Sequence, residues 1–216
     1  MFRICILLFF LVSQLQAQTT MIIPPNLQKG DTIAIVATAR KNIVDNLKPA
    51  LDLAKSWGLN VVIGKTIGLD NHQLAGTDEE RAADFQDMID NPNIKAVWCV
   101  RGGYGTARMV ELVDFSRFKA NPKWIIGFSD VTIFHQKINQ LGVESIHGIM
   151  PLGFTDGSME AKETLRNALF GESIRIDASP AKENCMGTAK GRLIGGNMTI
   201  IYSLIGTELS YDFKDK

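Results

Sequence analysis

The segment 124–132 holds residues that could carry out nucleophilic chemistry. An apolar run leads into Gly127 and Ser129 in a Gly-x-Ser pattern, and a segment with helical apolar spacing, 131–141, follows at once. This order is typical of a buried strand, a sharp turn and a helix, with the serine on the turn. A hydroxyl there would be exposed at the carboxyl end of a sheet, and the N–H groups that open the helix would face an oxyanion. The predicted chemistry is attack by Ser129 on a carbonyl carbon.

Ser129 also has a structural interpretation as a helix cap. Serine and aspartate commonly accept hydrogen bonds from the first N–H groups of a helix, so Ser129 or Asp130 could serve in that role. The hydrolase pattern Gly-x-Ser-x-Gly is incomplete here, because Val131 occupies its last position. Asp130 and Thr132 could themselves cap the helix, so Ser129 is not required for this. These residues alone leave both roles open.

The turn 101–105, Arg-Gly-Gly-Tyr-Gly, is the second chemical candidate. Consecutive glycines let backbone N–H groups approach a ligand closely, which suits an oxyanion or a phosphate. The turn does not match Gly-x-Gly-x-x-Gly, and no Gly-Lys-Ser/Thr follows it, so nucleotide binding has little support. A tight turn into a helix capped by Thr106 explains the same residues.

The histidines are the candidates for a general base. His135 lies six residues beyond Ser129 on one predicted helix, roughly 240° around its axis, so it is expected to face away from the serine. His147 is predicted at a strand end and could reach the same crevice, but nothing marks it as a base, and a hydrogen-bonded structural histidine is the favoured interpretation. His72 lies in a polar loop and gives no signal.

The cysteines and histidines do not predict a metal site. No Cys-x-x-Cys is present, and the three histidines are widely separated. Cys99 lies in the apolar run 94–100, so a buried free thiol is expected there rather than a disulfide with Cys185. Cys5 lies at the start of an apolar run and not after it, which makes it a poor site for lipid attachment.

Composition and the first residues narrow the class of protein. The 216 residues are 45% hydrophobic and carry a formal net charge of zero, which gives no electrostatic case for binding nucleic acid or an anionic membrane surface. Residues 1–18 combine one arginine, an apolar run of nine residues from Ile4 to Val12 and a polar end with Ala17. This is the layout of a cleavable secretory signal, so export to the periplasm is expected.

Strand-type and helix-type segments alternate along the chain. Strands are expected at 32–37, 61–63, 94–100 and 124–127, with helices at 43–57, 78–90, 106–113, 131–141 and 158–170. This alternation predicts an α/β fold, a flavodoxin-like and mainly parallel sheet with helices on both faces. The two glycine-bearing turns follow strands, so both are expected at the same edge of the sheet, where such folds bind ligands.

Several segments, in order, resemble the LD-carboxypeptidase family, which includes muropeptide carboxypeptidases and microcin-immunity carboxypeptidases. The resemblance covers about residues 27 to 210. The segments that carry it are 76–84, 94–98, 101–105, 127–132, 147–148 and 195–197. It implies an N-terminal α/β domain at 27–155, a surface helix and linker at 156–188, and the start of a C-terminal domain at 189–216.

The resemblance also implies roles for individual residues. Ser129 matches the nucleophile of a Ser-Glu-His triad, and the backbone N–H groups of Gly103 and Asp130 match an oxyanion hole. Substrate-binding roles are expected for the rest of the glycine turn, at Arg101, Gly102 and Tyr104. The expected reaction removes a terminal D-amino acid such as D-alanine from small peptidoglycan peptides (muropeptides). No metal or organic cofactor is implied, and a homodimer is a possibility.

The resemblance places the triad Glu and His in the C-terminal domain, beyond Lys216. Glu208 lies in a short tail with no recognisable pattern and is not a credible substitute. We therefore expect an incomplete serine carboxypeptidase with negligible activity from these 216 residues alone. A non-catalytic periplasmic peptide-binding protein and a decayed paralogue are the alternatives.

Overall fold

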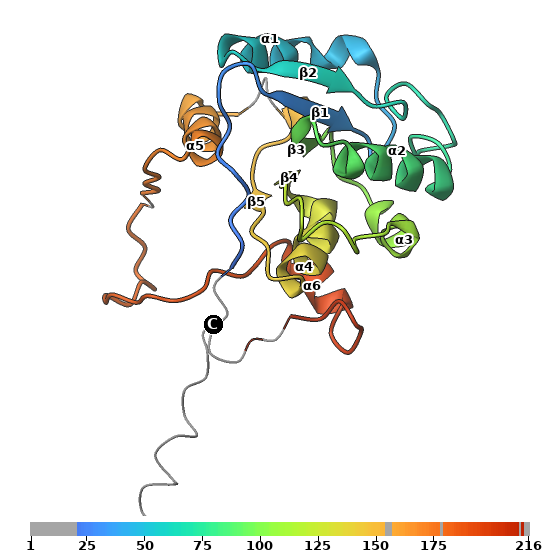
Figure 1. Ribbon diagram of the computed structural model, residues 1–216. Coiled ribbons are helices and arrows are strands. Elements are labelled where there is room, and N and C mark those ends of the chain that lie inside the picture. Colours follow the sequence, from blue (N-terminus) through green and yellow to red (C-terminus); the bar gives the residue numbers. More distant parts are fainter. Residues whose placement is uncertain (1–20, 154–156, 178, 212, 214–216) are drawn as a thin grey trace, which may run out of the picture.

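The computed structural model describes residues 21–153, 157–177, 179–211 and 213. Its centre is a parallel sheet of five strands in the order β2-β1-β3-β4-β5 (Figure 1). The strands are β1 (Thr32–Val36), β2 (Asn60–Ile63), β3 (Ile94–Cys99), β4 (Trp124–Gly127) and β5 (Ile146–His147). This order is the flavodoxin-like doubly wound arrangement, so the predicted fold class is confirmed.

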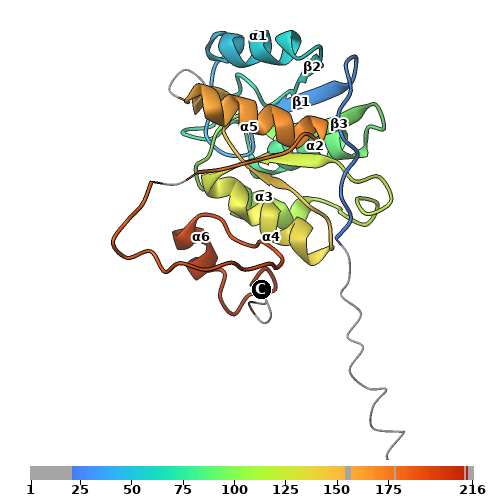
Figure 2. The same ribbon diagram turned by 90° about the vertical axis from the view of Figure 1, so that its left-hand side faces the viewer.

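Helices cover both faces of this sheet, as Figure 2 shows from the side. One face packs against α1 (Lys48–Ser56) and α5 (Met159–Phe170). The other packs against α2 (Asp78–Asp90), α3 (Thr106–Met109) and α4 (Thr132–Gln140), and α6 (Met198–Ser203) lies against α4. Single 3-10 turns occur at Val44–Leu47, Val110–Leu112, Ser129–Val131 and Pro151–Gly153.

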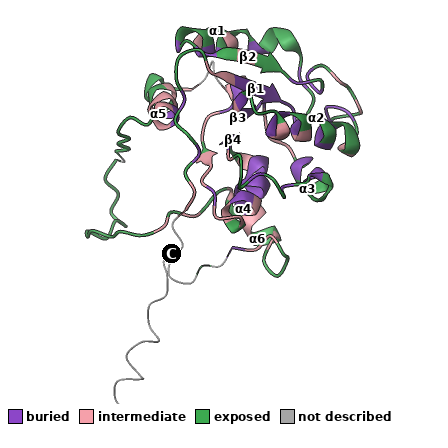
Figure 3. Cartoon of the chain, viewed as in Figure 1, coloured by how far each residue is buried: buried purple, intermediate pink, exposed green. Residues whose placement is uncertain are grey.

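The core is divided between the two faces of the sheet. Along β1, Ile33 and Ile35 pack on the side of α1, whereas Ala34 and Val36 pack on the side of α2. All four side chains are buried, which explains why the strand reads as a continuous apolar run. Figure 3 shows the buried residues gathered on the central strands and on the inner faces of the helices.

Two predicted helix caps have different outcomes. Thr77 forms the predicted capping box with Glu80, accepting from Glu80 N at 3.2 Å while Glu80 Oε2 accepts from Thr77 N at 2.7 Å. The prediction that Thr106 caps α3 is wrong, because α3 begins at Thr106 and Gly105 precedes it without a side-chain cap. The Thr106 hydroxyl donates instead to Asp130, on a different loop.

The later part of the chain contributes one well-packed helix. Ser158 caps α5, and Gly171 ends it in the left-handed conformation with φ of 74°. Leu165 and Leu169 of this helix are buried in the same core as β1. The following residues, 172–177 and 179–197, contain no helix or strand in the described structure, and most are exposed.

The sequence also led to expectations about a signal peptide and about the cysteines. The signal peptide expected at 1–18 lies outside the described residues. Within the part that is described, no helix has the length and apolar character needed to cross a bilayer. Cys99 is buried and Cys185 is exposed, and both thiols are free.

Candidate active site

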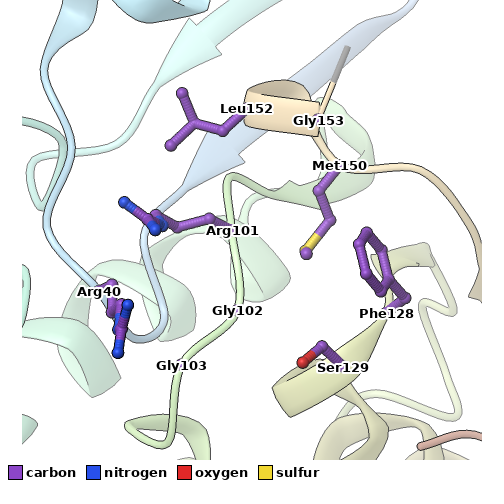
Figure 4. A pocket seen from close by; sticks show the side chains of 9 residues that line it. All are labelled: Arg40, Arg101, Gly102, Gly103, Phe128, Ser129, Met150, Leu152 and Gly153. Carbon is purple, nitrogen blue, oxygen red and sulfur yellow. The ribbon is translucent and has the colours of Figure 1, made fainter. Parts of the chain in front are cut away.

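A cleft of about 610 Å³ opens at the carboxyl ends of the central strands (Figure 4). The loops after β1, β3, β4 and β5 all contribute to it, which is the place where doubly wound folds bind ligands. The predicted meeting of the glycine turn and the serine turn is present, because β3 and β4 are neighbours in the sheet. The lining residues are Arg40, Arg101, Gly102, Gly103, Phe128, Ser129, Met150, Leu152 and Gly153.

Ser129 stands on a strained backbone turn. Its φ is 58°, in the left-handed region that costs an L-residue about 1–2 kcal/mol. Gly127 permits the turn, because a Cβ at that position would lie 2.7 Å from Val131 Cγ2. Neither the 3-10 turn at Ser129 nor α4 has a side-chain cap, and the Ser129 hydroxyl donates to no acceptor among the described residues. The capping interpretation of Ser129 is therefore wrong, and its hydroxyl is free to react.

The glycine turn lies directly against the serine. A Cβ at Gly102 would be 3.1 Å from Ser129 Cβ and 3.2 Å from Ser129 Oγ, while a Cβ at Gly103 would press on Ala39 and Arg40. The backbone N–H groups of Gly103 and Asp130 have no hydrogen-bond acceptor in the described part of the chain. One free N–H group directly follows the serine and the other belongs to the adjoining glycine turn, and backbone donors of this kind form oxyanion sites.

The side chain of Asp130 lies beneath the cleft and not in it. The residue is 1% exposed, and its Oδ2 accepts hydrogen bonds from Thr106 N at 3.0 Å and Thr106 Oγ1 at 2.7 Å. Burial raises the pKa of this carboxyl, and the two bonds from Thr106 oppose that shift. Only the backbone of Asp130 can therefore contact a ligand.

Two arginines give one side of the cleft positive charge. Arg101 was among the predicted site residues, and its Nη1 donates to Lys41 O at 3.4 Å. Arg40 was missed, because it lies in the loop after β1 and the sequence alone does not place that loop beside the glycine turn. Neither guanidinium has an ion-pair partner among the described residues, so both can meet a carboxylate. Tyr104 is not in the lining, and its hydroxyl bonds with Gln73.

Phe128 and Met150 give an apolar surface to the side of the cleft across from Arg40 and Arg101, and Leu152 lies beside Arg101 (Figure 4). Phe128 comes from the turn after β4, and Met150 and Leu152 from the loop after β5. The sequence did not identify these three residues as lining the cleft. For Met150 and Leu152 the reason is that the chain after β5 has no periodic pattern that would predict its position over the cleft. An apolar wall facing two guanidinium groups suits a ligand with a carboxylate at one end.

The histidines do not contact Ser129. His135 is buried, with Nε2 2.8 Å from Gly127 O and Nδ1 2.8 Å from Ser145 Oγ. Burial lowers the pKa of His135 to about 4, so the ring is neutral and structural, and it faces away from the serine as predicted. His147 is at the predicted strand end, where its ring lies beside Phe128. Among the described residues, no histidine donates to or accepts from Ser129, and no cluster of potential metal ligands occurs.

Comparison with known proteins identifies the family. The fold and cleft define an α/β protein whose ligand site combines a serine turn with a glycine turn. Residues 33–148 match the model of the LD-carboxypeptidase N-terminal domain. The chain belongs to the LD-carboxypeptidase family.

Individual relatives agree with this assignment. The chain is 36% identical to the probable murein peptide carboxypeptidase of Bacillus subtilis over 89% of its own length and 62% of that protein's. It is 32% identical to the murein tetrapeptide carboxypeptidase of Pseudomonas aeruginosa over 81% and 60%. The crystal structure of muramoyltetrapeptide carboxypeptidase from Oxalobacter formigenes superimposes with a TM-score of 0.71 at 28% identity, covering 84% of this chain and 62% of that one. The chain thus spans less than two thirds of the length of these relatives.

Proposed function

We propose that this chain carries the nucleophile and the oxyanion site of a serine-type LD-carboxypeptidase that acts on peptidoglycan peptides. The observation that carries the proposal is the position of Ser129 on a left-handed turn, with its hydroxyl free and in contact range of Gly102. The family and its named murein peptide carboxypeptidases support the substrate class. The expected substrate is a peptidoglycan-derived tetrapeptide that ends in D-alanine.

In the proposed reaction, Ser129 Oγ attacks the carbonyl carbon of the bond before the terminal D-residue. The hydroxyl proton passes to a base, and the carbonyl oxygen becomes an oxyanion that the N–H groups of Gly103 and Asp130 stabilise. Collapse of the tetrahedral intermediate breaks the C–N bond, and the leaving amine takes up the proton. Water then hydrolyses the ester on Ser129 and releases the shortened peptide.

Arg40 and Arg101 fit this substrate. A C-terminal D-amino acid carries a free carboxylate, and guanidinium groups bind carboxylates through charge-assisted hydrogen bonds. The apolar wall at Phe128 and Met150 would then contact the aliphatic part of the peptide. The signal-like residues 1–18 support a periplasmic location, where peptidoglycan peptides are found.

The base is the part of the mechanism that the described residues do not supply. His135 has both ring nitrogens occupied, and His147 makes no bond with Ser129. The family resemblance places the Glu and His of the triad beyond Lys216. We therefore propose that residues 1–216 alone have negligible turnover, since loss of one triad member costs about 10⁴-fold or more in rate.

A boronic acid tests the nucleophile without requiring turnover. A peptide ending in the boronic-acid analogue of an L-amino acid presents boron in place of the scissile carbonyl carbon, and serine oxygen adds to it to form a tetrahedral adduct. Boron-11 NMR of the intact protein with the ligand should show the tetrahedral boron of this adduct. Ser129→Ala should give none. No adduct with the unsubstituted chain, or an equal signal from the alanine variant, would refute the proposal.

A further inference from the structure

A buried hydrogen-bonded pair joins the two loops that form the candidate oxyanion site. Asp130 directly follows the serine, and Thr106 directly follows the glycine turn. The carboxylate of Asp130 accepts from both the backbone N–H and the hydroxyl of Thr106, and the two residues are 1% and 0% exposed. Twenty-four residues of sequence separate them. The pair therefore fixes one loop relative to the other, independently of the sheet.

Arg81 holds the same end of the glycine turn from α2. Its Nη1 donates to Gly105 O at 2.9 Å and to Thr38 O at 2.7 Å, and the residue is 1% exposed. A Cβ at Gly105 would lie 2.5 Å from that Nη1, so the turn has no room to shift on this side. The Thr106 hydroxyl also lies 3.3 Å from the Thr38 hydroxyl. The glycine turn is thus tied to β1, α2 and the serine turn at once.

The Asp130 carboxylate accepts from the N–H of Thr106, the first residue of α3, but it is only partly satisfied. Its Oδ1 is buried without a hydrogen-bond partner among the described residues. A buried charge with unfilled acceptor capacity costs stability compared with an apolar side chain of similar size. Stability alone would not favour the Asp130 carboxylate at this position. A role in shaping the candidate oxyanion site accounts for its presence.

We infer that the Asp130 side chain and Thr106 form a strut that sets the spacing between the N–H groups of Gly103 and Asp130. Both are positioning residues, because neither side chain reaches the cleft. Donors fixed before substrate arrives stabilise a developing oxyanion without reorganisation, and small displacements reduce that effect strongly. This inference rests on the proposed function of Ser129 and adds the elements that hold its oxyanion site in place.

The test compares binding of a transition-state mimic with binding of an ordinary peptide. Thr106→Val removes the hydroxyl donor at nearly constant size, and Thr106→Ser keeps it. We expect the valine variant to lose about tenfold or more in affinity for the peptide boronic acid, the cost typical of a disturbed oxyanion donor. Its affinity for the matching peptide without boron should be unchanged. The serine variant should restore boronate binding to near the wild-type value.

The chain contains a matched control for the loss of a buried hydrogen bond. Asp84 Oδ2 accepts from Thr66 N at 3.0 Å and Thr66 Oγ1 at 2.5 Å, and both residues are buried. This pair has the same geometry as the strut but lines no part of the cleft. Because Thr66 Oγ1 also accepts from Ala37 N at 3.1 Å, Thr66→Val should lower the melting temperature at least as much as Thr106→Val, and it should leave the boronate affinity at the wild-type value.

The outcomes separate the inference from the proposed function. Asp130→Asn keeps an acceptor oxygen but no charge, and it serves as a second variant if Thr106→Val does not fold; its boronate affinity should also fall. Two results would overturn the strut and leave the role of Ser129 intact. One is wild-type boronate affinity in the folded Thr106→Val and Asp130→Asn variants, and the other is an equal loss of boronate affinity in Thr66→Val. Absence of any adduct on Ser129 in the unsubstituted chain would overturn both.

Discussion

His135 is hydrogen-bonded through Nε2 to the backbone carbonyl oxygen of Gly127, the residue two positions before Ser129, at 2.8 Å. A carbonyl only accepts, so Nε2 carries the proton and Nδ1 accepts from the Ser145 hydroxyl. The same carbonyl accepts from Gly148 N at 3.1 Å. Hydrogen bonds from α4 and from the residue after β5 therefore hold Gly127, the last residue of β4, in place. The turn that carries Ser129 starts at this fixed residue.

Protonation of His135 should destabilise the fold in acid. Its pKa is about 4 in the folded chain against 6.5 for an unperturbed histidine, so the unfolded chain binds more protons between these values. The free energy of unfolding should therefore fall as the pH drops from 6.5 to 4, by about 3 kcal/mol from this group. Urea unfolding at several pH values measures it.

His135→Gln is the control for this pH dependence. The glutamine amide can still donate to Gly127 O but does not titrate in this range. The variant should lose a part of its free energy of unfolding that does not depend on pH. Its free energy of unfolding should also change less with pH than that of the wild type. Parallel profiles for the two proteins would show that His135 is not the titrating group.

Relief of the strained turn at Ser129 should stabilise the chain. Glycine adopts the left-handed conformation without the steric cost that a Cβ imposes, so Ser129→Gly should be more stable than Ser129→Ala by about 1 kcal/mol. For a domain of this size the difference corresponds to roughly 2–4 °C in melting temperature. Calorimetry of both variants checks the value.

His72 provides the comparison for this strain. It has the same backbone conformation, with φ of 59°, but is exposed in a loop away from the cleft. His72→Gly should likewise be more stable than His72→Ala, and both should form the boronate adduct at Ser129 normally. A melting temperature for Ser129→Gly at or below that of Ser129→Ala would contradict the strain argument.

Adding one methyl group at Gly102 should impair the site with little effect on the fold. Its Cβ would meet Ser129 Cβ at 3.1 Å and Oγ at 3.2 Å, so the hydroxyl must move away from its present position. A displacement of this kind should weaken the adduct of Ser129 with the peptide boronic acid by about tenfold or more. Gly153→Ala is the control, since it lines the same cleft and a Cβ there meets no atom of the described residues within 4 Å. Equal affinities of the two variants for the boronic acid would be evidence against contact between the glycine turn and Ser129.

Much of the fold was accessible from sequence because the signals were local. Buried strands such as β1 and β3 appear as short apolar runs, and the capping box at Thr77 marks the start of α2. Parallel strands place their carboxyl ends at one edge, which predicted that both turns lie there. The contact between Gly102 and Ser129 also needs β3 and β4 to be neighbours, which only the folded chain shows.

What could not be predicted depends on contacts between distant segments. Thr106 has the residue type and position of a helix cap, and only the folded chain shows that its hydroxyl is bonded to Asp130. Arg40 resembles any exposed arginine until β1 is placed beside β3. That the Ser129 hydroxyl is free could be established only from the backbone geometry of the folded chain. The sequence does not separate the two roles, because a serine on a turn commonly acts either as a helix cap or as a nucleophile.

Release of D-alanine from a peptidoglycan tetrapeptide tests the central claim most directly. The measurement uses residues 1–216 joined to a C-terminal domain of this family that supplies the triad Glu and His, beside the Ser129→Ala variant of the same protein. The account predicts turnover by the unsubstituted protein, and for the variant no turnover but peptide affinity close to the wild-type value. A Ser129→Ala protein that releases D-alanine at the wild-type rate would contradict the account.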